Sequence, residues 1–233
     1  MRKGEVRRQA IIEAADALFC RRGYLETTVD DILRALSCSK GSFYHYFESK
    51  LAVLQAICEE RAEKSFARYK ATRAASTREK LDALLYCMQP FSPGEEDFLV
   101  MTLRLRMRGE GLVTDGATRR SLRRLFKPEL QNVLMVLGET GAARIARARL
   151  DDVMFEACTA FYDEVCEAVI QCARSGESVA RPVTQVVEAE RFLWERALDM
   201  DYGSVTLVRL DETLPMLDRV AQRLRKARGG GVV

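Results

Sequence analysis

Side chains in the segment 28–50, TVDDILRALSCSKGSFYHYFESK, have the types and spacing needed for chemistry at a nucleic-acid surface. Lys40, Ser42 and His45 carry donors and acceptors that can reach base edges in a DNA groove. Phe43 and a second phenylalanine four residues later fall on the opposite face of a short helix, where they can anchor it to the protein. The pattern predicts a helix that enters the major groove of DNA.

Lysines and hydroxyls beside this helix suit the phosphate oxygens of the DNA backbone. We expect phosphate contacts from Thr28, Tyr44, Tyr46 and Lys50. The complete predicted DNA-binding set is Thr28, Ser39, Lys40, Ser42, Phe43, Tyr44, His45, Tyr46 and Lys50.

Two short helices joined by a tight turn must position these side chains. Thr28 is suited to cap the first helix. The Asp31 side chain can accept a hydrogen bond from the Thr28 backbone N–H, which would complete a capping box. The turn falls at Ser37-Cys38, and Ser39 can cap the second helix. The arrangement is typical of a helix-turn-helix.

The run from Ser39 to Phe47, followed by Ser49-Lys50, resembles the recognition helix of the TetR family of bacterial one-component repressors. The upstream segments 21–24 and 28–32 fit the same pattern. The resemblance covers about the first fifty-five residues. One departure is the turn, where the family usually places glycine and an aliphatic residue and this chain has Ser37-Cys38.

The resemblance implies an all-α protein with two domains. A three-helix DNA-binding domain is expected over residues 1–49, and a larger helical ligand-binding and dimerisation domain over residues 50–233. Composition agrees with a helical fold, because 233 residues contain only 5 prolines and 14 glycines and 48% of them are hydrophobic. A net charge of +3 is too small to identify a nucleic-acid partner by itself.

Local features set further expectations about partners and location. Arg2, Lys3, Arg7 and Arg8 can lie along phosphates, although a solvated terminus explains them equally well. No long uncharged apolar run and no secretory signal are visible, so we expect no membrane contact and a cytoplasmic protein.

Breaking residues divide the chain into further helices. The expected ranges are 5–22, 50–69, 77–88, 95–108, 117–137, 150–173, 182–200 and 211–228. Pro128 should interrupt the 117–137 helix. Residues 202–210 are expected to form an extended loop.

The residue pattern of helix 150–173 indicates how the chain assembles. Its polar residues fall on one strip, and the rest of its surface is apolar over an arc wider than an ordinary surface helix needs. Helix 182–200 is its expected companion. A buried central helix in a monomer would give the same pattern, but the family resemblance implies a homodimer formed by two late helices in a four-helix bundle.

Large apolar side chains in the body suit either a core or a ligand cavity. The predicted ligand-binding set is Phe66, Tyr69, Phe98, Met101, Phe126, Leu130 and Phe161. We expect an unknown apolar or amphipathic small molecule between the helices that begin near residues 50, 95, 117 and 150.

Three other groups of residues carry alternative readings. The basic cluster around Arg119, Arg123 and Lys127 suits a solvated helix face better than an anion site. Asp152 and Glu156 lie one turn apart, but no histidine or third carboxylate joins them as a metal site. The seven cysteines lack a Cys-x-x-Cys pair and are expected to be buried thiols.

These observations predict a ligand-responsive transcriptional regulator, a repressor that binds a palindromic DNA operator as a homodimer and is released by a small-molecule inducer. A thiol- or redox-sensing DNA-binding regulator is the alternative. An all-helical enzyme is a weaker alternative, because the sequence has no phosphate loop, no His-Glu-x-x-His and no nucleophile motif. We therefore expect no catalysis, no cofactor and no metal.

Overall fold

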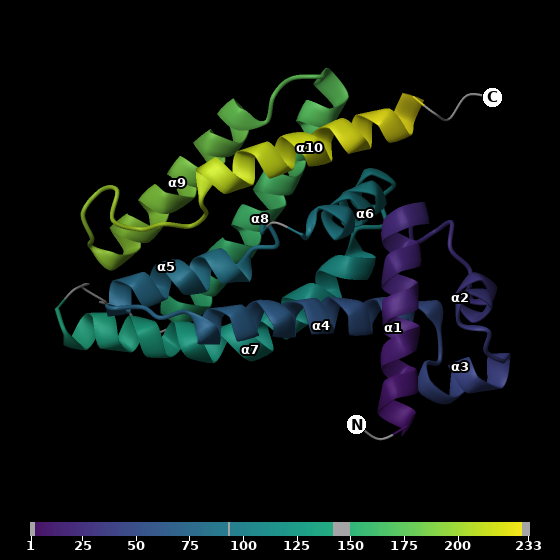
Figure 1. The fold of residues 1–233 in the computed structure, drawn as a ribbon. Helices are drawn as coiled ribbons and strands as arrows, with labels where there is room; N and C mark the ends of the chain where they lie inside the picture. The colour runs from purple at the N-terminus through teal and green to yellow at the C-terminus, as the bar shows by residue number, and fades with distance from the viewer. Residues whose placement is uncertain (1–2, 93, 142–149, 230–233) are drawn as a thin grey trace. The chain divides into compact units, whose positions relative to one another are not determined.

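The computed structural model describes residues 3–92, 94–141 and 150–229, and these residues form helices without any strand (Figure 1). The all-α prediction is confirmed. In chain order the helices are α1 (Lys3–Arg22), α2 (Val29–Leu36), α3 (Lys40–Tyr46), α4 (Lys50–Ala71), α5 (Thr77–Met88), α6 (Glu96–Met107), α7 (Leu112–Glu139), α8 (Leu150–Ser175), α9 (Ala180–Leu198) and α10 (Leu210–Gly229).

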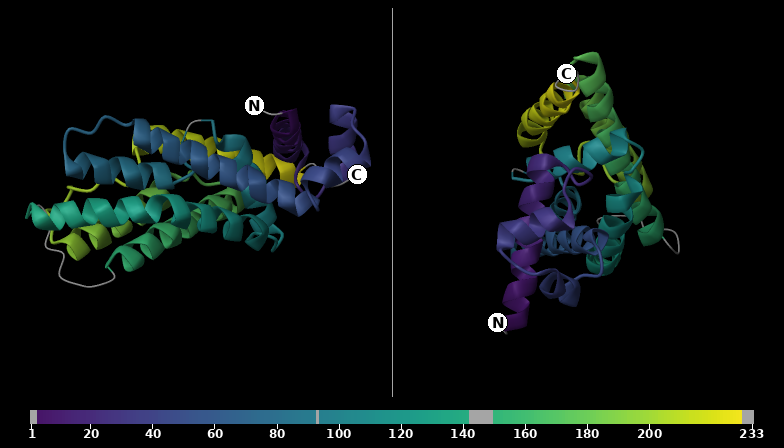
Figure 2. Two further views of the ribbon diagram at one scale, coloured as in Figure 1. Left: turned by 90° about the horizontal axis from the view of Figure 1, so that it is seen from below. Right: turned by 90° about the vertical axis from the view of Figure 1, so that its right-hand side faces the viewer.

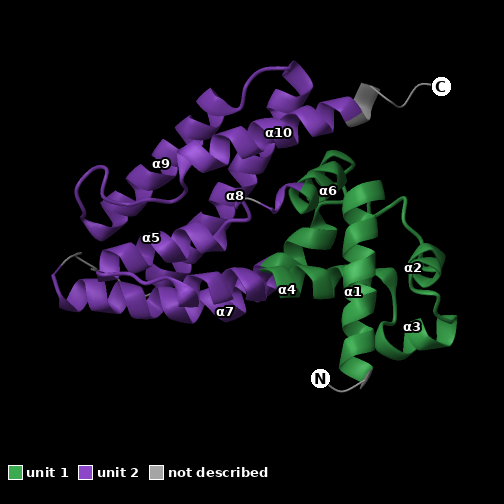
Figure 3. Ribbon diagram, in the orientation of Figure 1, with its two compact units in different colours: residues 1–61, 97–118 green, residues 62–96, 119–233 purple. Residues whose placement is uncertain are grey.

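The chain packs into two compact units (Figure 3). Unit 1 contains residues 1–61 and 97–118, and unit 2 contains residues 62–96 and 119–233. Helices α4, α6 and α7 contribute residues to both units. The expected domains 1–49 and 50–233 are a functional division, which a division by packing does not test.

The core of unit 1 forms because α1 repeats apolar residues every three or four positions. Ile11, Ala15 and Phe19 on this helix are fully buried, and they pack in one cluster with Ile32 of α2 and Phe43 of α3. The ring of Phe19 meets the ring of Tyr24 edge to face, with 5.1 Å between centroids. This core supports α2 and α3 from behind.

The core of unit 2 is organised around α8, which packs against both α9 and α10 (Figure 2). Met154, Phe155, Phe161 and Val169 of α8 are almost completely buried, and Trp194 of α9 is fully buried. Helix α8 therefore has the wide apolar surface that the sequence predicts, and most of that surface is buried within the protomer.

Helix α7 is longer than predicted and runs through Pro128 without a break. A proline inside a helix removes one backbone hydrogen bond. Phe126 and Leu130, on either side of it, are fully buried, so their packing offsets that loss. The expected interruption near Pro128 was wrong because tertiary packing outweighs one missing hydrogen bond.

The segment between α9 and α10 is a loop, as predicted. Its Thr206 N–H donates to Asp82 Oδ1 of α5 at 2.8 Å, which holds the loop against that helix. Within the described ranges, no helix has both the length and the apolar character needed to span a membrane.

Candidate DNA-binding site

Helix α2 begins where the sequence predicts, because Thr28 and Asp31 cap it reciprocally. The Thr28 backbone N–H donates to Asp31 Oδ2 at 2.8 Å, and the Asp31 N–H donates to Thr28 Oγ1 at 3.1 Å. The hydrogen bond from the Thr28 hydroxyl lowers the pKa of the Asp31 carboxyl. The capping box thus fixes the start of the helix-turn-helix.

The turn between α2 and α3 requires an unusual backbone conformation at Ser37. This residue has φ 50° and ψ 44°, in the left-handed region that favours glycine. The Cys38 N–H donates to the Leu33 carbonyl at 3.1 Å, which closes the end of α2. The departure from the family pattern therefore falls at the residue where a glycine would be least strained.

Helix α3 separates its anchoring residues from its polar residues. Ser39 caps it by accepting from the Ser42 N–H at 3.3 Å, as predicted. Phe43 and Phe47 are buried, so Phe43 supports the helix from within the core. The other predicted side chains of α3 are at least partly accessible to solvent, namely Lys40, Ser42, Tyr44, His45 and Tyr46.

The side chains of this exposed face differ in the contacts that they make. Lys40 Nζ lies 3.3 Å from Asp30 Oδ1, and both side chains are more than half exposed. Such an exposed pair is weak, so Lys40 can leave it for a DNA acceptor. The ring of His45 meets the ring of Tyr46 edge to face, with 4.7 Å between centroids.

Lys50, a predicted phosphate contact, has internal partners. Its Nζ donates to the carbonyl oxygens of Tyr24 and Thr27, each at 2.8 Å, and lies 4.2 Å from the centre of the Tyr24 ring. Burial lowers the pKa of this ammonium. Two of its three N–H groups thus fasten the segment before α2 to α4, and the predicted phosphate contact would use the third.

Sequence reasoning did not select two arginines beside the start of α2. Arg22 Nη1 lies 3.3 Å from Asp31 Oδ1, and Arg34 Nη2 lies 2.6 Å from the same atom. Both guanidinium groups are mostly exposed. The spacing of Asp31 and Arg34, three residues apart on one helix, was the available signal. Of the predicted N-terminal cations, Arg2 and the side chain of Lys3 lie outside the described residues.

Residues 11–57, which contain this helix-turn-helix, match the family described as bacterial regulatory proteins, tetR family. The helix-turn-helix region matches the TetR family. Helices α1, α2 and α3 form this region, and the larger helical part follows.

Known relatives of this chain are similar mainly over that region. YuxN of Bacillus subtilis, an uncharacterized HTH-type transcriptional regulator, is 43% identical over 58 residues, which are 25% of this chain and 20% of YuxN. The HTH-type transcriptional repressor KstR2 of Rhodococcus jostii is 35% identical over 81 residues, which are 34% of this chain and 40% of KstR2. The chain therefore spans less than half of these relatives' length.

A solved structure extends the likeness to the larger helical part. The crystal structure of a putative TetR-family transcriptional regulator from Rhodococcus sp. has a TM-score of 0.53 and covers 78% of this chain and 95% of that one. Its identity is 18%, so this likeness shows the fold alone.

The predicted ligand-binding residues are divided between the two units. Phe98 and Met101 belong to the core of unit 1, where the Arg61 guanidinium lies 4.2 Å from the centre of the Phe98 ring. Phe66, Tyr69, Phe126 and Leu130 lie in unit 2, and the Phe66 and Phe126 rings meet edge to face with 5.2 Å between centroids.

Phe161 forms a separate contact with Phe91, with 6.4 Å between ring centroids. Of the predicted set, Tyr69 lines a cavity of about 250 Å³ next to Glu129. Its hydroxyl lies 3.3 Å from Glu129 Oε2, and burial raises the pKa of Tyr69 to about 12. Phe126 and Leu130 are fully buried, and Phe161 is almost fully buried.

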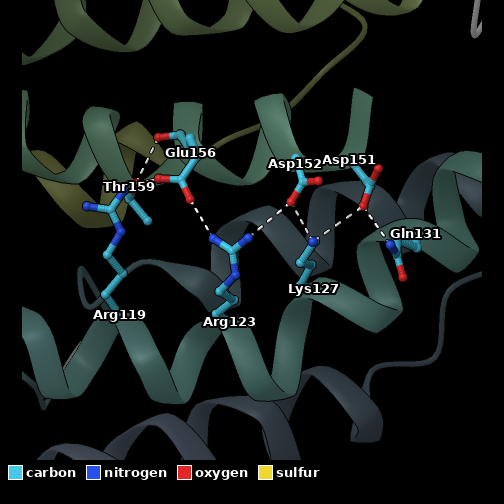
Figure 4. A network of polar contacts seen from close by, with 8 residues as sticks. All are labelled: Arg119, Arg123, Lys127, Gln131, Asp151, Asp152, Glu156 and Thr159. Atoms are coloured by element: carbon cyan, nitrogen blue, oxygen red, sulfur yellow. Dashed lines mark hydrogen bonds and ion pairs between the residues drawn. The ribbon is translucent and has the colours of Figure 1, made fainter. Parts of the chain in front are cut away.

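The basic cluster of α7 pairs with the acidic start of α8 (Figure 4). Arg123 donates to Glu156 Oε1 at 2.8 Å and to Asp152 Oδ1 at 3.1 Å, and Lys127 Nζ lies 2.5 Å from the same Asp152 atom. Arg119 also pairs with Glu156. This α7–α8 ladder shows that the polar strip of α8 faces another helix along its first turns.

The ladder engages the carboxylates of Asp152 and Glu156. Their oxygens accept from guanidinium and ammonium groups, and the residues that the structure describes contain no group of three His, Cys, Asp or Glu side chains suited to a metal ion.

All seven cysteines lie in described residues, and none forms a disulfide. Burial, followed by the nearby Asp16, raises the pKa of Cys20 to about 12. Burial likewise raises the pKa of Cys58 to about 11 and that of Cys158 well above its usual range. These thiols stay protonated near neutral pH, which disfavours nucleophilic or redox chemistry.

Proposed function

We propose that this TetR-family transcriptional regulator binds a palindromic DNA operator as a homodimer, represses transcription there, and leaves the operator when it binds a small molecule. The observation that carries the proposal is that α3 has one buried apolar face and one exposed polar face. Phe43 of α3 and the C-cap residue Phe47 are buried in unit 1. Lys40, Tyr44 and His45 are exposed on a helix that the Ser39 cap begins. That is the form in which a recognition helix presents base-reading groups.

Two copies are needed because one seven-residue helix reads only one short half-site. Residues on the outer surface of α8 and α9 supply a candidate interface, since Val153, Phe192 and Leu193 remain exposed in the protomer, and Ala160 does too. A two-fold axis through this surface would make it self-complementary.

The apolar surface of α8 also includes Phe155, Cys158, Tyr162 and Cys166. Phe155, Cys158 and Cys166 are buried inside the protomer, and Tyr162 stacks on Phe91 with 5.8 Å between centroids. Ala160 and Leu193 are therefore better positions for testing the interface.

The repressor role is supported by the name of KstR2, a transcriptional repressor similar to this chain over its DNA-binding part. A ligand response is supported by α4, a continuous helix of 22 residues that contributes to both units. A ligand can shift the regulator only by binding its DNA-competent and released states unequally. We place the protein in the cytoplasm, where a bacterial regulator meets its operator.

The test is a gel-shift titration with DNA that flanks the protein's own gene. Lys40→Ala and His45→Ala should each cost about 1–3 kcal/mol of operator binding and relax specificity at one base position. The matched control is Lys64→Ala, which removes an exposed lysine from unit 2 and should leave affinity unchanged. Unchanged affinity in both α3 variants would show that α3 does not read the operator.

A further inference from the structure

A cleft of about 550 Å³ opens within unit 2, and its lining includes none of the predicted ligand-binding residues. It lies among the last turn of α4, the segment that follows it, helix α5 and the loop before α10. Its volume is in the range of sites that hold small organic ligands, about 300–1,000 Å³.

The acidic side chains that line this cleft already have structural roles. Asp82 Oδ1 accepts from the Thr206 N–H at 2.8 Å, and Glu79 Oε2 accepts from the Ala75 N–H at 2.8 Å. Glu79 therefore holds the segment before α5 against that helix, and Asp82 holds the loop before α10 against it. Because both are engaged with backbone N–H groups, they compete only partly for the nearby cations.

Three arginines, Arg68, Arg73 and Arg209, also line the cleft, so its cations outnumber its carboxylates. Arg68 Nη2 donates to Ser65 Oγ at 3.1 Å, and Arg209 Nη1 lies 3.3 Å from Glu212 Oε1. Both Arg68 and Arg73 are exposed. Guanidinium groups bind carboxylates through two parallel hydrogen bonds, which makes such a cluster selective for planar anions.

The cleft also offers an aromatic surface beside these cations. The Tyr86 ring lines it, and the Arg209 guanidinium lies 5.0 Å from the centre of that ring. Ala83 and the buried Cys87 extend the apolar part of the lining. A ligand with a carboxylate at one end and a flat apolar body could therefore satisfy both parts of the site at once.

We propose that this cleft is the effector site of the regulator and that it takes an organic anion, a carboxylate on an aromatic body. The proposal rests on the ligand response proposed above. The carboxylate binds the guanidinium groups of Arg73 and Arg209, and the aromatic body packs on Tyr86. The site lies at the C-terminal end of α4, the helix that also enters unit 1.

The binding test uses 2-naphthoate and its neutral counterpart 2-naphthamide, measured by calorimetric titration of the full chain. The acid should bind at least about tenfold more tightly than the amide, since it alone makes charge-assisted hydrogen bonds to arginine. Arg73→Gln and Arg209→Gln should each weaken the acid by about tenfold and leave the amide unchanged. The control Arg120→Gln removes an exposed arginine that does not line the cleft.

Inorganic phosphate forms a third arm of the titration. Phosphate binding as tightly as 2-naphthoate would overturn the organic part of the proposal, and equal binding of acid and amide would overturn the anionic part. Absence of any 2-naphthoate binding at millimolar concentration would also overturn it. Operator binding by the unliganded Arg73→Gln and Arg209→Gln variants is measured in parallel. Operator binding by these variants should equal that by the unmodified protein. The DNA-binding proposal is therefore tested independently of the effector-site proposal.

Discussion

Glu190 on α9 is a residue whose protonation should affect stability near neutral pH. Its Oε1 accepts from the Trp194 indole N–H at 2.9 Å. Burial, and to a smaller extent the negative charge of Glu164, raises the pKa of Glu190 from 4.5 to about 7. The folded protein therefore binds a proton here between pH 4.5 and about 7 that the unfolded chain has released.

The sign of the pH effect follows from this difference. The stabilisation associated with protonated Glu190 is complete below pH 4.5 and is lost as the pH rises through about 7. Glu190→Gln cannot ionise, so it should raise the unfolding free energy at pH 8 by about 1–2 kcal/mol, reduced by the partial exposure of the carboxyl. Urea unfolding at pH 5.5 and pH 8 measures this change.

The matched control for Glu190 is Glu188→Gln, which alters an exposed carboxyl on the same helix. It should leave the dependence of stability on pH unchanged. If Glu190→Gln retained the full loss of stability between pH 5.5 and pH 8, another group would be responsible for that loss.

Between helices, the α7–α8 ladder should be worth more than the ion pairs at the DNA-binding site. The Lys127 and Asp152 side chains are only 20% and 25% exposed, compared with 69% and 59% for Lys40 and Asp30. Solvent screens exposed pairs strongly. A double-mutant cycle with Lys127→Met and Asp152→Asn should give a coupling of about 1 kcal/mol in chemical unfolding, falling with added salt.

The same cycle on the exposed pair, with Lys40→Met and Asp30→Asn, serves as the comparison and should give a coupling of about zero. A coupling for Lys127 and Asp152 no larger than that of the exposed pair would mean that the ladder contributes specificity of packing rather than stability.

Helix boundaries could be predicted from the sequence where local chemistry determines them. Thr28, Ser39 and Ser49 each cap a helix, and Gly23 ends α1 with φ 105°. These devices act within four residues, so their signal is contained in the sequence.

Contacts between distant segments could not be predicted from the sequence. The pairing of Thr206 with Asp82 joins residues 124 positions apart, and no local pattern indicates it. Likewise, no local pattern indicates that the Phe161 ring packs against Phe91. The cleft with Arg73 and Arg209 was missed for the same reason, because its lining comes from both ends of unit 2 in sequence.

At the scale of the whole molecule, dimerisation should control operator binding. Leu193 is 45% exposed in the protomer and lies on α9. Leu193→Glu places a charge in the proposed interface, where losing water without gaining a partner costs several kcal/mol. The variant should sediment as a monomer at micromolar concentration and bind the operator at least about a hundredfold more weakly.

Leu112→Glu is the control, because it makes the same change at a residue that is 86% exposed at the start of α7. It should leave both assembly and operator affinity intact. An unmodified protein that sedimented as a monomer, or a Leu193→Glu variant that stayed dimeric, would remove α9 from the interface.

The uneven burial of the thiols gives the protein a natural attachment point for a spectroscopic label. Five of the seven cysteines are buried, and the half-buried Cys20 has its pKa raised to about 12. Cys38, also half-buried, directly precedes the Ser39 cap of α3. A nitroxide attached there, with the other thiols intact, would place one paramagnetic probe beside each recognition helix of a homodimer. Dipolar spectroscopy would then read the spacing of the two helices in solution, before and after an effector is added.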